Sequence, residues 1–558
     1  RDSICIGVEV VLEIMVPKLM ADLIDIGVTN SDVPYIINKG IQMAVCAVAA
    51  LILGVGSARF SALAGQGLGA NIRKAEYEKL QSYSFSNIDH FSVSSLVTRL
   101  TSDVTNIQNA VSTGMRPFGR SPVMLIFATT LAFQINSTLA LVFLVALPVL
   151  AVMLIIIIIN VGPRYGRMQG AVDLVNRCIE ENLTAVRVVK SYVRGDYEIE
   201  KFRNVNDNLK NESEKAFGIA VLNMPAMQFV MYSTILGILL IGGRLINSGQ
   251  MMIGQLTSFL SYVLLILNSL MMMSNVFLLM TRSLASAERI MKVIDEPIDI
   301  TDENAKDIEV KKGEIEFNHV WFKYKDTAKE YVLSDVSFHI NAGQTVGIIG
   351  QTGSSKTTLI QLIPRLYDAS KGEIKIDGIN VKEYPVRHLR DAISVVLQKN
   401  TLFSGSLIDN LRWGNENATL DEIKEACSIA CVDEFIDRLP GGFDAEMGQE
   451  GVNVSGGQKQ RICIARAILK KPKVLILDDS TSAVDTATEG KIRNALAKKL
   501  PDMTKIIIAQ RISSVRHADQ IIIMDGGCVN AIGTHESLLK TNKIYQEIYE
   551  SQKEGADL

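Results

Sequence analysis

The sequence predicts a polytopic α-helical membrane domain followed by an α/β domain, and three observations support this fold class. The chain has 558 residues, enough for roughly two to four domains. Six segments before residue 300 are long and apolar enough to cross a bilayer. After Pro297, short β-rich runs alternate with helical ones. We therefore expect a membrane domain at residues 1–300 and a second domain at residues 301–558.

The predicted spans are helices of roughly 20 apolar residues, the length that crosses a hydrocarbon core about 30 Å thick. The third and fourth spans are separated only by an uncharged stretch ending at Thr138, so we expect a tight turn between them. The six segments are 4–26, 41–66, 119–134, 138–160, 217–243 and 252–281.

Long charged loops follow the second and fourth spans, and we expect both on the cytoplasmic side. The loop at 161–215 holds ten basic residues, whereas the short opposite turns offer only Lys39 and Arg244. Basic residues favour the cytoplasmic side of a membrane, and an even number of spans then places both ends there. This predicts a multi-pass protein of the cell membrane with the second domain in the cytoplasm.

Both long loops are expected to continue the helices into the cytoplasm. Helical patterning is interrupted near Asp89 and near Asn182. A reversal of direction at these points would present a blunt tip that contacts a soluble domain. An ordinary helix–helix corner explains the same pattern.

The first span carries three charged side chains, at Glu9, Glu13 and Lys18. Each costs about 2.5–3.5 kcal/mol at the membrane midplane, so all three must face protein or water. Glu9 and Glu13 share one helix face. They either line a path that favours cations or pack near the cytoplasmic leaflet.

The second domain is expected to contain a mostly parallel sheet covered by helices. Its apolar runs are predicted to be strands buried on both faces, which is typical of parallel sheets. These runs are 346–349, 393–396, 474–477 and 506–508.

The strand ending at Ile349 is followed by a nearly complete phosphate-binding loop. A strand, a tight loop and a helix start form a cradle of backbone N–H groups for an anion. Lys356 is expected to reach the phosphates and Thr357 to hold Mg²⁺. Where a glycine is usual, Ser355 stands, and a left-handed conformation there costs about 1–3 kcal/mol. The candidate nucleotide contacts are Gly350, Thr352, Gly353, Ser354, Ser355, Lys356, Thr357 and Thr358.

Two more motifs belong to the same chemistry. Asp478 ends a buried strand and is placed to orient Mg²⁺. Ser455, Gly456, Gly457 and Gln458 begin a predicted helix and form a second phosphate-recognition edge. One nucleotide is not easily held by two such edges, so we expect the second to serve a nucleotide bound to another chain.

With these motifs the chain resembles a half-transporter of the ATP-binding cassette (ABC) exporter family over essentially its whole length. The resemblance implies that Ser455–Gln458 is the signature motif and that ATP and Mg²⁺ are bound. It also implies that Tyr324 stacks on adenine, although a core tyrosine is the alternative. Gln398 resembles the Q-loop glutamine that touches Mg²⁺, and residues Ser482 to Asp485 resemble the D-loop at the dimer interface. The interruptions near Asp89 and Asn182 match the family's coupling helices.

Two residues depart from the family pattern. Asp479 stands where the family has a glutamate that acts as general base, and Gln510 stands at the switch position where the family has histidine. Losing a well-placed base costs about 10²–10⁴ in rate. The signature motif is intact, so the chain resembles the degenerate-site subunit of heterodimeric bacterial multidrug exporters. We expect a different partner subunit with the intact glutamate and histidine.

The predicted function is ATP-driven export of hydrophobic or amphiphilic compounds by alternating access. A homodimeric lipid or peptide exporter and an ATP-gated channel or regulator are the alternatives. The methionines at 227, 231, 271–273 and 280 either line an adaptable apolar pocket or pack in the bilayer. With 57 Lys and Arg against 60 Asp and Glu, the chain has no basic surplus, so no nucleic-acid partner is expected. Seven scattered cysteines predict reduced thiols.

Overall fold

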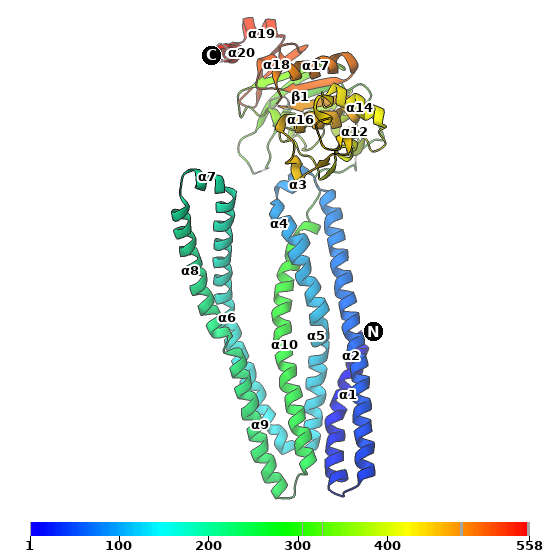
Figure 1. Cartoon of the computed structure of the whole chain (residues 1–558), viewed down its shortest axis with the longest axis vertical. Coiled ribbons are helices and arrows are strands. Elements are labelled where there is room, and N and C mark those ends of the chain that lie inside the picture. Colours follow the sequence, from blue (N-terminus) through cyan, green and yellow to red (C-terminus); the bar gives the residue numbers. More distant parts are fainter. Residues whose placement is uncertain (1, 304, 326, 480–483, 555–558) are drawn as a thin grey trace. The chain divides into compact units, whose positions relative to one another are not determined.

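The computed structural model describes residues 2–303, 305–325, 327–479 and 484–554. The chain forms two compact units (Figure 1). The first comprises Arg1–Leu80 and Ser94–Asp295, and the second comprises Gln81–Val93 and Glu296–Leu558. The second unit thus includes a segment that the sequence analysis assigned to the membrane domain.

The described part of the first unit is helical throughout, apart from turns. The helices α5 and α10 run side by side, as do α6 and α8 (Figure 1). The elements are α1 (Asp2–Asp22), η1 (Leu23–Val28), α2 (Val33–Gln81), α4 (Val93–Thr98), η2 (Arg99–Asp103), α5 (Val104–Ile135), α6 (Ser137–Thr184), α7 (Val186–Ser191), α8 (Gly195–Ala220), α9 (Asn223–Asn247) and α10 (Ile253–Ile294).

Each of the six predicted spans falls on helix, with one break where α8 ends at Ala220 and α9 begins at Asn223. Among the described residues, four helical stretches are long and apolar enough to cross a membrane: Val33–Gln81, Val93–Ile135, Gly195–Asn247 and Ile253–Ile294. A shorter apolar helix covers Ser137–Met153. The helix α1 carries the three charges at Glu9, Glu13 and Lys18, which lower its apolar character.

Apolar side chains on the outward face of α2 are strongly exposed, which is the pattern of a surface that faces lipid. Val45 is 61% exposed, Val48 is 56% and Ile52 is 66% exposed. A soluble protein rarely leaves such a contiguous apolar face open. Inside the unit the core is closely packed, with the rings of Phe143 and Phe259 stacked 5.4 Å apart.

The predicted turn between the third and fourth spans is confirmed. The helix α5 ends at Ile135, and α6 begins at Ser137. Asn136 caps α6, because its Oδ1 accepts the backbone N–H of Leu139 at 3.0 Å. The second interruption, predicted at 182–185, is also confirmed. The helix breaks at Ala185, and α7 and a turn at 192–194 follow before α8 begins at Gly195.

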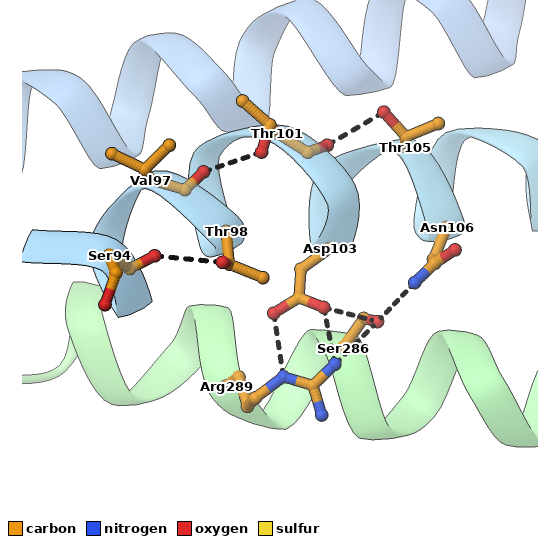
Figure 2. A network of polar contacts seen from close by, with 9 residues as sticks. All are labelled: Ser94, Val97, Thr98, Thr101, Asp103, Thr105, Asn106, Ser286 and Arg289. Carbon is orange, nitrogen blue, oxygen red and sulfur yellow. Dashed lines mark hydrogen bonds and ion pairs between the residues drawn. The ribbon is translucent and has the colours of Figure 1, made fainter. Parts of the chain in front are cut away.

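An ion pair between a buried carboxylate and a half-exposed arginine joins η2 to α10 (Figure 2). Asp103 is 1% exposed, and its Oδ2 accepts the Nε–H of Arg289 at 2.7 Å while its Oδ1 accepts a second guanidinium N–H. Ser286 donates to the same Oδ1 at 2.9 Å, and Asn106 donates to Ser286 at 3.1 Å. This network fixes the positions of the two helices relative to each other.

The second unit contains two main sheets. Its strands are β1 (Ile315–Phe322), β2 (Leu333–Ile340), β3 (Thr345–Gly350), β4 (Lys371–Ile376), β5 (Ile379–Asn380), β6 (Ile393–Val396), β7 (Gly405–Ser406), β8 (Glu446–Met447), β9 (Val474–Asp478), β10 (Thr504–Ile508), β11 (Gln520–Asp525) and β12 (Cys528–Gly533).

The larger sheet has the order β12-β11-β3-β10-β9-β6 and is parallel except for β12. This confirms the mostly parallel sheet and its four predicted strands. A second sheet, β2-β1-β4-β5, is antiparallel and was not predicted. Its strand β1 alternates buried and more exposed positions, so it lacks the continuous apolar run that marks the parallel strands.

The helices of this unit cover the sheets and carry most of the remaining chain. They are α3 (Phe85–Asp89), α11 (Lys356–Gln361), η3 (Val381–Glu383), α12 (Val386–Asp391), α13 (Leu407–Arg412), α14 (Leu420–Ile429), α15 (Asp433–Ile436), η4 (Gly442–Asp444), η5 (Gln449–Gly451), α16 (Gly456–Leu469), α17 (Thr486–Lys499), α18 (Ile512–Val515), α19 (His535–Thr541) and α20 (Lys543–Glu554).

The helix α3 packs against the rest of this unit. Asp89 accepts a hydrogen bond from the hydroxyl of Tyr367 at 2.7 Å, and Asn87 donates to the carbonyl of Pro297 at 2.8 Å. The predicted contact of the Asp89 tip with a soluble domain is therefore confirmed.

Candidate functional site

Three neighbouring parallel strands place the predicted motifs at one edge of the large sheet. The strands β3, β10 and β9 are adjacent, so the residues that follow their carboxyl ends meet there. A cavity of about 320 Å³ lies at this edge. Its lining consists of Thr352, Gly353, Ser355, Lys356, Thr357, Thr358, Gln398, Asp478, Asp479, Ile508 and Gln510.

The loop after β3 wraps around the ammonium group of Lys356. Its Nζ donates to the carbonyls of Gly350 and Gln351, both at 2.8 Å, and to Ser354 Oγ at 3.1 Å. Burial lowers the pKa of Lys356. Gly350 and Ser354 thus shape the loop around the lysine, although neither lines the cavity. Any Cβ at Gly350 would lie 2.2 Å from the carbonyl oxygen of Met524, so only glycine fits there.

Ser355 adopts the left-handed conformation that the sequence analysis considered, with φ 68° and ψ 23°. Gly353 also has a positive φ, of 87°. A side chain disfavours this region by about 1 kcal/mol, because the Cβ crowds the backbone. The loop therefore carries a backbone strain that glycine at this position would remove.

Ser355→Gly is expected to tighten nucleotide binding to this site by about fivefold, the equivalent of 1 kcal/mol. Titration with a fluorescent ATP analogue measures the change. Gly353→Ala is the matched control, because a Cβ there meets nothing within 4 Å and adds only backbone strain. It should weaken binding. Weaker binding to Ser355→Gly would contradict the strain argument.

Asp478 offers an oxygen that suits a metal ion. Its Oδ1 accepts a hydrogen bond from Thr357 Oγ1 at 3.3 Å, while its buried Oδ2 has no partner among the described residues. Burial raises the pKa of Asp478. The amide of Gln398 lines the same cavity. A carboxylate, a hydroxyl and an amide oxygen form the kind of ligand set that Mg²⁺ takes, so these residues fit that ion.

The two departures from the family pattern contact each other. Gln510 Nε2 donates to Asp479 Oδ2 at 2.9 Å. Burial raises the pKa of Asp479, and the Gln510 hydrogen bond opposes this effect. Asp479 has a φ of 46°, and its N–H donates to the carbonyl of Ile508 at 3.0 Å. The short carboxylate is thus held by the glutamine.

Tyr324 lies beside the cavity rather than in its lining. Its hydroxyl shares a hydrogen bond of 2.9 Å with Thr358 Oγ1, and its ring is 42% exposed. Its ring packs edge-on against Tyr367 at 5.2 Å. A line of contacts therefore runs from Asp89 of α3 through Tyr367 and Tyr324 to Thr358. The sequence analysis missed Tyr367, because no motif surrounds it.

The signature residues lie outside this cavity. Ser455 caps α16, with its Oγ accepting the N–H of Gln458 at 3.3 Å and the Gln458 amide oxygen accepting the N–H of Ser455 at 2.9 Å. Ser455 and Gly456 are exposed, and Gly457 is half-buried. Within the described chain none of the four lines the cavity. Asp485 caps α17, accepting the N–H of Thr488 at 2.9 Å. The D-loop residues Ser482 and Ala483 lie outside the described residues.

Comparison with known proteins gives consistent results for both units. Residues 4–270 match the model of the ABC transporter transmembrane region, and residues 333–482 match the ABC transporter model. The chain is 38% identical over 551 residues to the uncharacterized ABC transporter ATP-binding protein YfiB of Bacillus subtilis, covering 98% of this chain and 96% of that protein. It is 32% identical over 493 residues to the ATP-dependent lipid A-core flippase of Desulfotalea psychrophila, covering 88% and 85%.

A solved structure of a bacterial Atm1-family ABC exporter with ATP bound has the same fold. The TM-score is 0.85 at 22% identity, and the match covers 99% of this chain and 97% of that one. The helical membrane domain and the α/β domain predicted from the sequence are both confirmed.

Proposed function

Because this chain belongs to the ABC transporter family, we propose that it is one subunit of a heterodimeric exporter and that its own nucleotide site is degenerate. Its domains make it a multi-pass membrane protein with a cytoplasmic ATPase domain, and ABC exporters act as dimers in a lipid bilayer. Export driven by ATP is the shared activity of such proteins. The identity of the partner and the asymmetry between the sites are our proposal.

The observation that carries this proposal is the pair formed by Asp479 and Gln510. The carboxylate that should accept a proton from water is one methylene shorter than glutamate and is already hydrogen-bonded to Gln510 at 2.9 Å. A base that is displaced and occupied loses about 10²–10⁴ in rate. Meanwhile Lys356 and Thr357 remain arranged for binding. The site is therefore built to hold nucleotide and to hydrolyse it slowly.

The exposed signature motif, Ser455–Gln458, supports the proposal that this chain acts as one subunit of a heterodimer. Ser455 and Gly456 are exposed and lie outside the lining of the chain's own cavity, at the N-terminus of the 14-residue helix α16. Backbone N–H groups at a helix start favour phosphate. This edge would close over the nucleotide of the partner, whose intact glutamate and histidine perform fast hydrolysis.

At the chain's own nucleotide site, different residues bind the phosphates and the metal ion. Lys356 and the loop amides bind the phosphates, and Thr357, Asp478 and Gln398 would hold Mg²⁺. The ion supplies positive charge that neutralises the phosphate oxygens. Binding at both sites would draw the cassettes together, and hydrolysis at the partner's site would let them part. A nucleotide shifts this equilibrium only by its differential affinity for the two states.

The proposed substrates are hydrophobic or amphiphilic compounds. Similarity to a lipid A-core flippase supports an amphiphile, because the printed activity of that relative concerns a lipid. Uphill accumulation of a fluorescent amphiphile in reconstituted vesicles, halted by a non-hydrolysable ATP analogue, tests export. A channel would only equilibrate the dye.

The rate of ATP hydrolysis by the native heterodimer tests whether its two nucleotide sites differ in activity. Asp479→Ala is expected to change ATP hydrolysis by less than about threefold, whereas alanine at the partner's Walker B glutamate should lower it about 10²–10⁴-fold, because only that residue serves as a placed base. Phosphate release by the co-purified complex is the measurement. Asp437→Ala, at an exposed position of the same domain, is the control. Equal losses from both sites, or brisk hydrolysis by a complex of identical chains, would refute the proposal.

A further inference from the structure

The membrane unit contains an open cavity of about 1070 Å³, separate from the nucleotide cavity. Residues of α1, α2, α5, α6, α9 and α10 line it. Most of this lining is apolar and includes Met224, Met227, Met231 and Met271. Small-molecule sites measure about 300–1,000 Å³, so this one has room for a large amphiphile. Methionine side chains adapt to varied apolar shapes.

One wall of the cavity carries four charged side chains in a single cluster. Arg116 Nη2 donates to Glu9 Oε1 at 2.6 Å, and Arg120 Nη1 lies 3.7 Å from the same oxygen. Arg120 also forms an ion pair with Glu13. The pairs stand at i, i+4 on α1 and on α5, so the cluster joins two helices. These four are the charged residues in the part of the lining that the structure describes.

Gly54 of α2 makes room for this cluster. A Cβ at Gly54 would lie 2.9 Å from Arg116 Nη2 and 3.2 Å from Glu9 Oε1. The backbone of a third helix therefore closes over the pair. Ionised side chains within a membrane domain are costly and are usually functional. The close fit of three helices around them indicates a built site rather than a chance contact.

The exposure of the four side chains indicates which charge the cluster presents. Glu9 is only 3% exposed, whereas Arg116 is 33%, Glu13 29% and Arg120 22% exposed. The charge of Glu9 is therefore covered, and the accessible part of the cluster has two guanidinium groups and one carboxylate, which leaves one excess positive charge. Each guanidinium has five N–H donors. Arg116 Nε and Glu9 Oε2 are both buried without a hydrogen-bond partner in the described chain, so neither atom reaches a ligand in the cavity.

We propose that this cavity binds amphiphiles with an anionic headgroup, which Arg116 and Arg120 contact while the methionines contact the apolar tail. The inference rests on the proposed export function and names the substrate class for it. Guanidinium groups match phosphate, carboxylate and sulfonate oxygens in geometry and charge. Glu9 acts as a positioning residue, because it offsets the repulsion between the arginines. A dissolved amphiphile and a membrane lipid share this headgroup chemistry.

Direct binding without nucleotide tests the proposal separately from export. The full-length protein with its co-purified partner, in phosphatidylcholine nanodiscs, is titrated with 11-(dansylamino)undecanoic acid. The analogous 11-(dansylamino)undecylamine has the same reporter and tail but carries a terminal ammonium in place of the carboxylate. Arg120→Gln should weaken binding of the acid by about tenfold or more, as expected for the loss of a charge-assisted contact. Glu13→Gln should leave it unchanged or tighten it severalfold.

A conservative variant and a matched control keep the test falsifiable. Arg120→Lys keeps the charge and should restore acid binding to within about threefold of the native value, even if Arg120→Gln folds poorly. Lys18→Gln, an exposed charge on α1 outside the lining, should change nothing. Tighter binding of the amine than of the acid, together with weaker amine binding in Glu13→Gln, would overturn the proposal. Acid binding that is unchanged in Arg120→Gln would overturn it as well. Competition by phosphatidylglycerol in the nanodisc would identify a membrane lipid as the source, and no competition would identify a dissolved amphiphile.

Discussion

Lys356→Ala is expected to lower the affinity of this chain's own site for ATP by about 10²–10³-fold. The ammonium is half-buried, and two carbonyls and Ser354 hold it at the centre of the loop. Each charge-assisted hydrogen bond to phosphate contributes about 1.5–3 kcal/mol, and the lysine offers at least two such bonds. Under the proposed asymmetry Asp479 and Gln510 make this site a slow one, so the loss should appear in binding and far less in ATP hydrolysis by the pair.

A fluorescent ATP analogue titrated into the complex measures this loss, provided the partner's site is first disabled by the same lysine change in that chain. Lys382→Ala is the matched control, because Lys382 is half-exposed and pairs with Asp368 away from the cavity. It should leave the affinity unchanged. A loss of less than about threefold for Lys356→Ala would mean that this site holds no nucleotide, and the degenerate-site proposal would fail with it.

Arg289→Gln is expected to destabilise the membrane unit by about 1–3 kcal/mol, the cost of depriving a buried acceptor of its donors. Figure 2 shows the reason: Asp103 is buried and takes two bonds from this guanidinium, so removing the arginine removes both. Ser286 alone would remain as its donor from α10. The midpoint of thermal unfolding of the full chain, followed by circular dichroism in detergent, should fall clearly.

The double variant Asp103→Asn with Arg289→Gln sharpens this test. It removes both charges of this pair, so its loss of stability should be smaller than the sum of the two single losses. Lys74→Gln is the control, because Lys74 and Glu78 form an exposed pair at 3.9 Å that contributes little. A shift for Arg289→Gln no larger than that for Lys74→Gln would show that this ion pair does not hold η2 to α10.

The motifs were predictable because each is contained in a short stretch of chain. The strand β3, the loop and Lys356 follow one another directly, and the apolar spans are marked by composition alone. The sequence analysis predicted strain at Ser355 if this residue adopts a left-handed conformation. The structure shows that conformation, with a φ of 68°. The roles of the individual site residues stay predictions that the experiments above test.

Contacts between distant residues were beyond sequence reasoning. Glu9 and Arg116 lie 107 positions apart, and Asp103 and Arg289 lie 186 apart. Helical periodicity shows that Glu9 and Glu13 share a face, but it does not say which arginine meets them. Both glutamates pair with arginine and line a cavity, an arrangement that neither alternative in the sequence analysis described. Partner choice depends on helix packing, which no local pattern encodes.

The membership of Gln81–Val93 in the second unit affects any attempt to study the ATPase domain alone. A soluble fragment starting after Asp295 would lack α3, so Tyr367 would lose both the carboxylate of Asp89 and the neighbouring ring of Phe85. The newly bared aromatic patch would promote self-association. Because Tyr367 also supports Tyr324, nucleotide affinities measured on such a fragment would describe a protein missing part of its own fold.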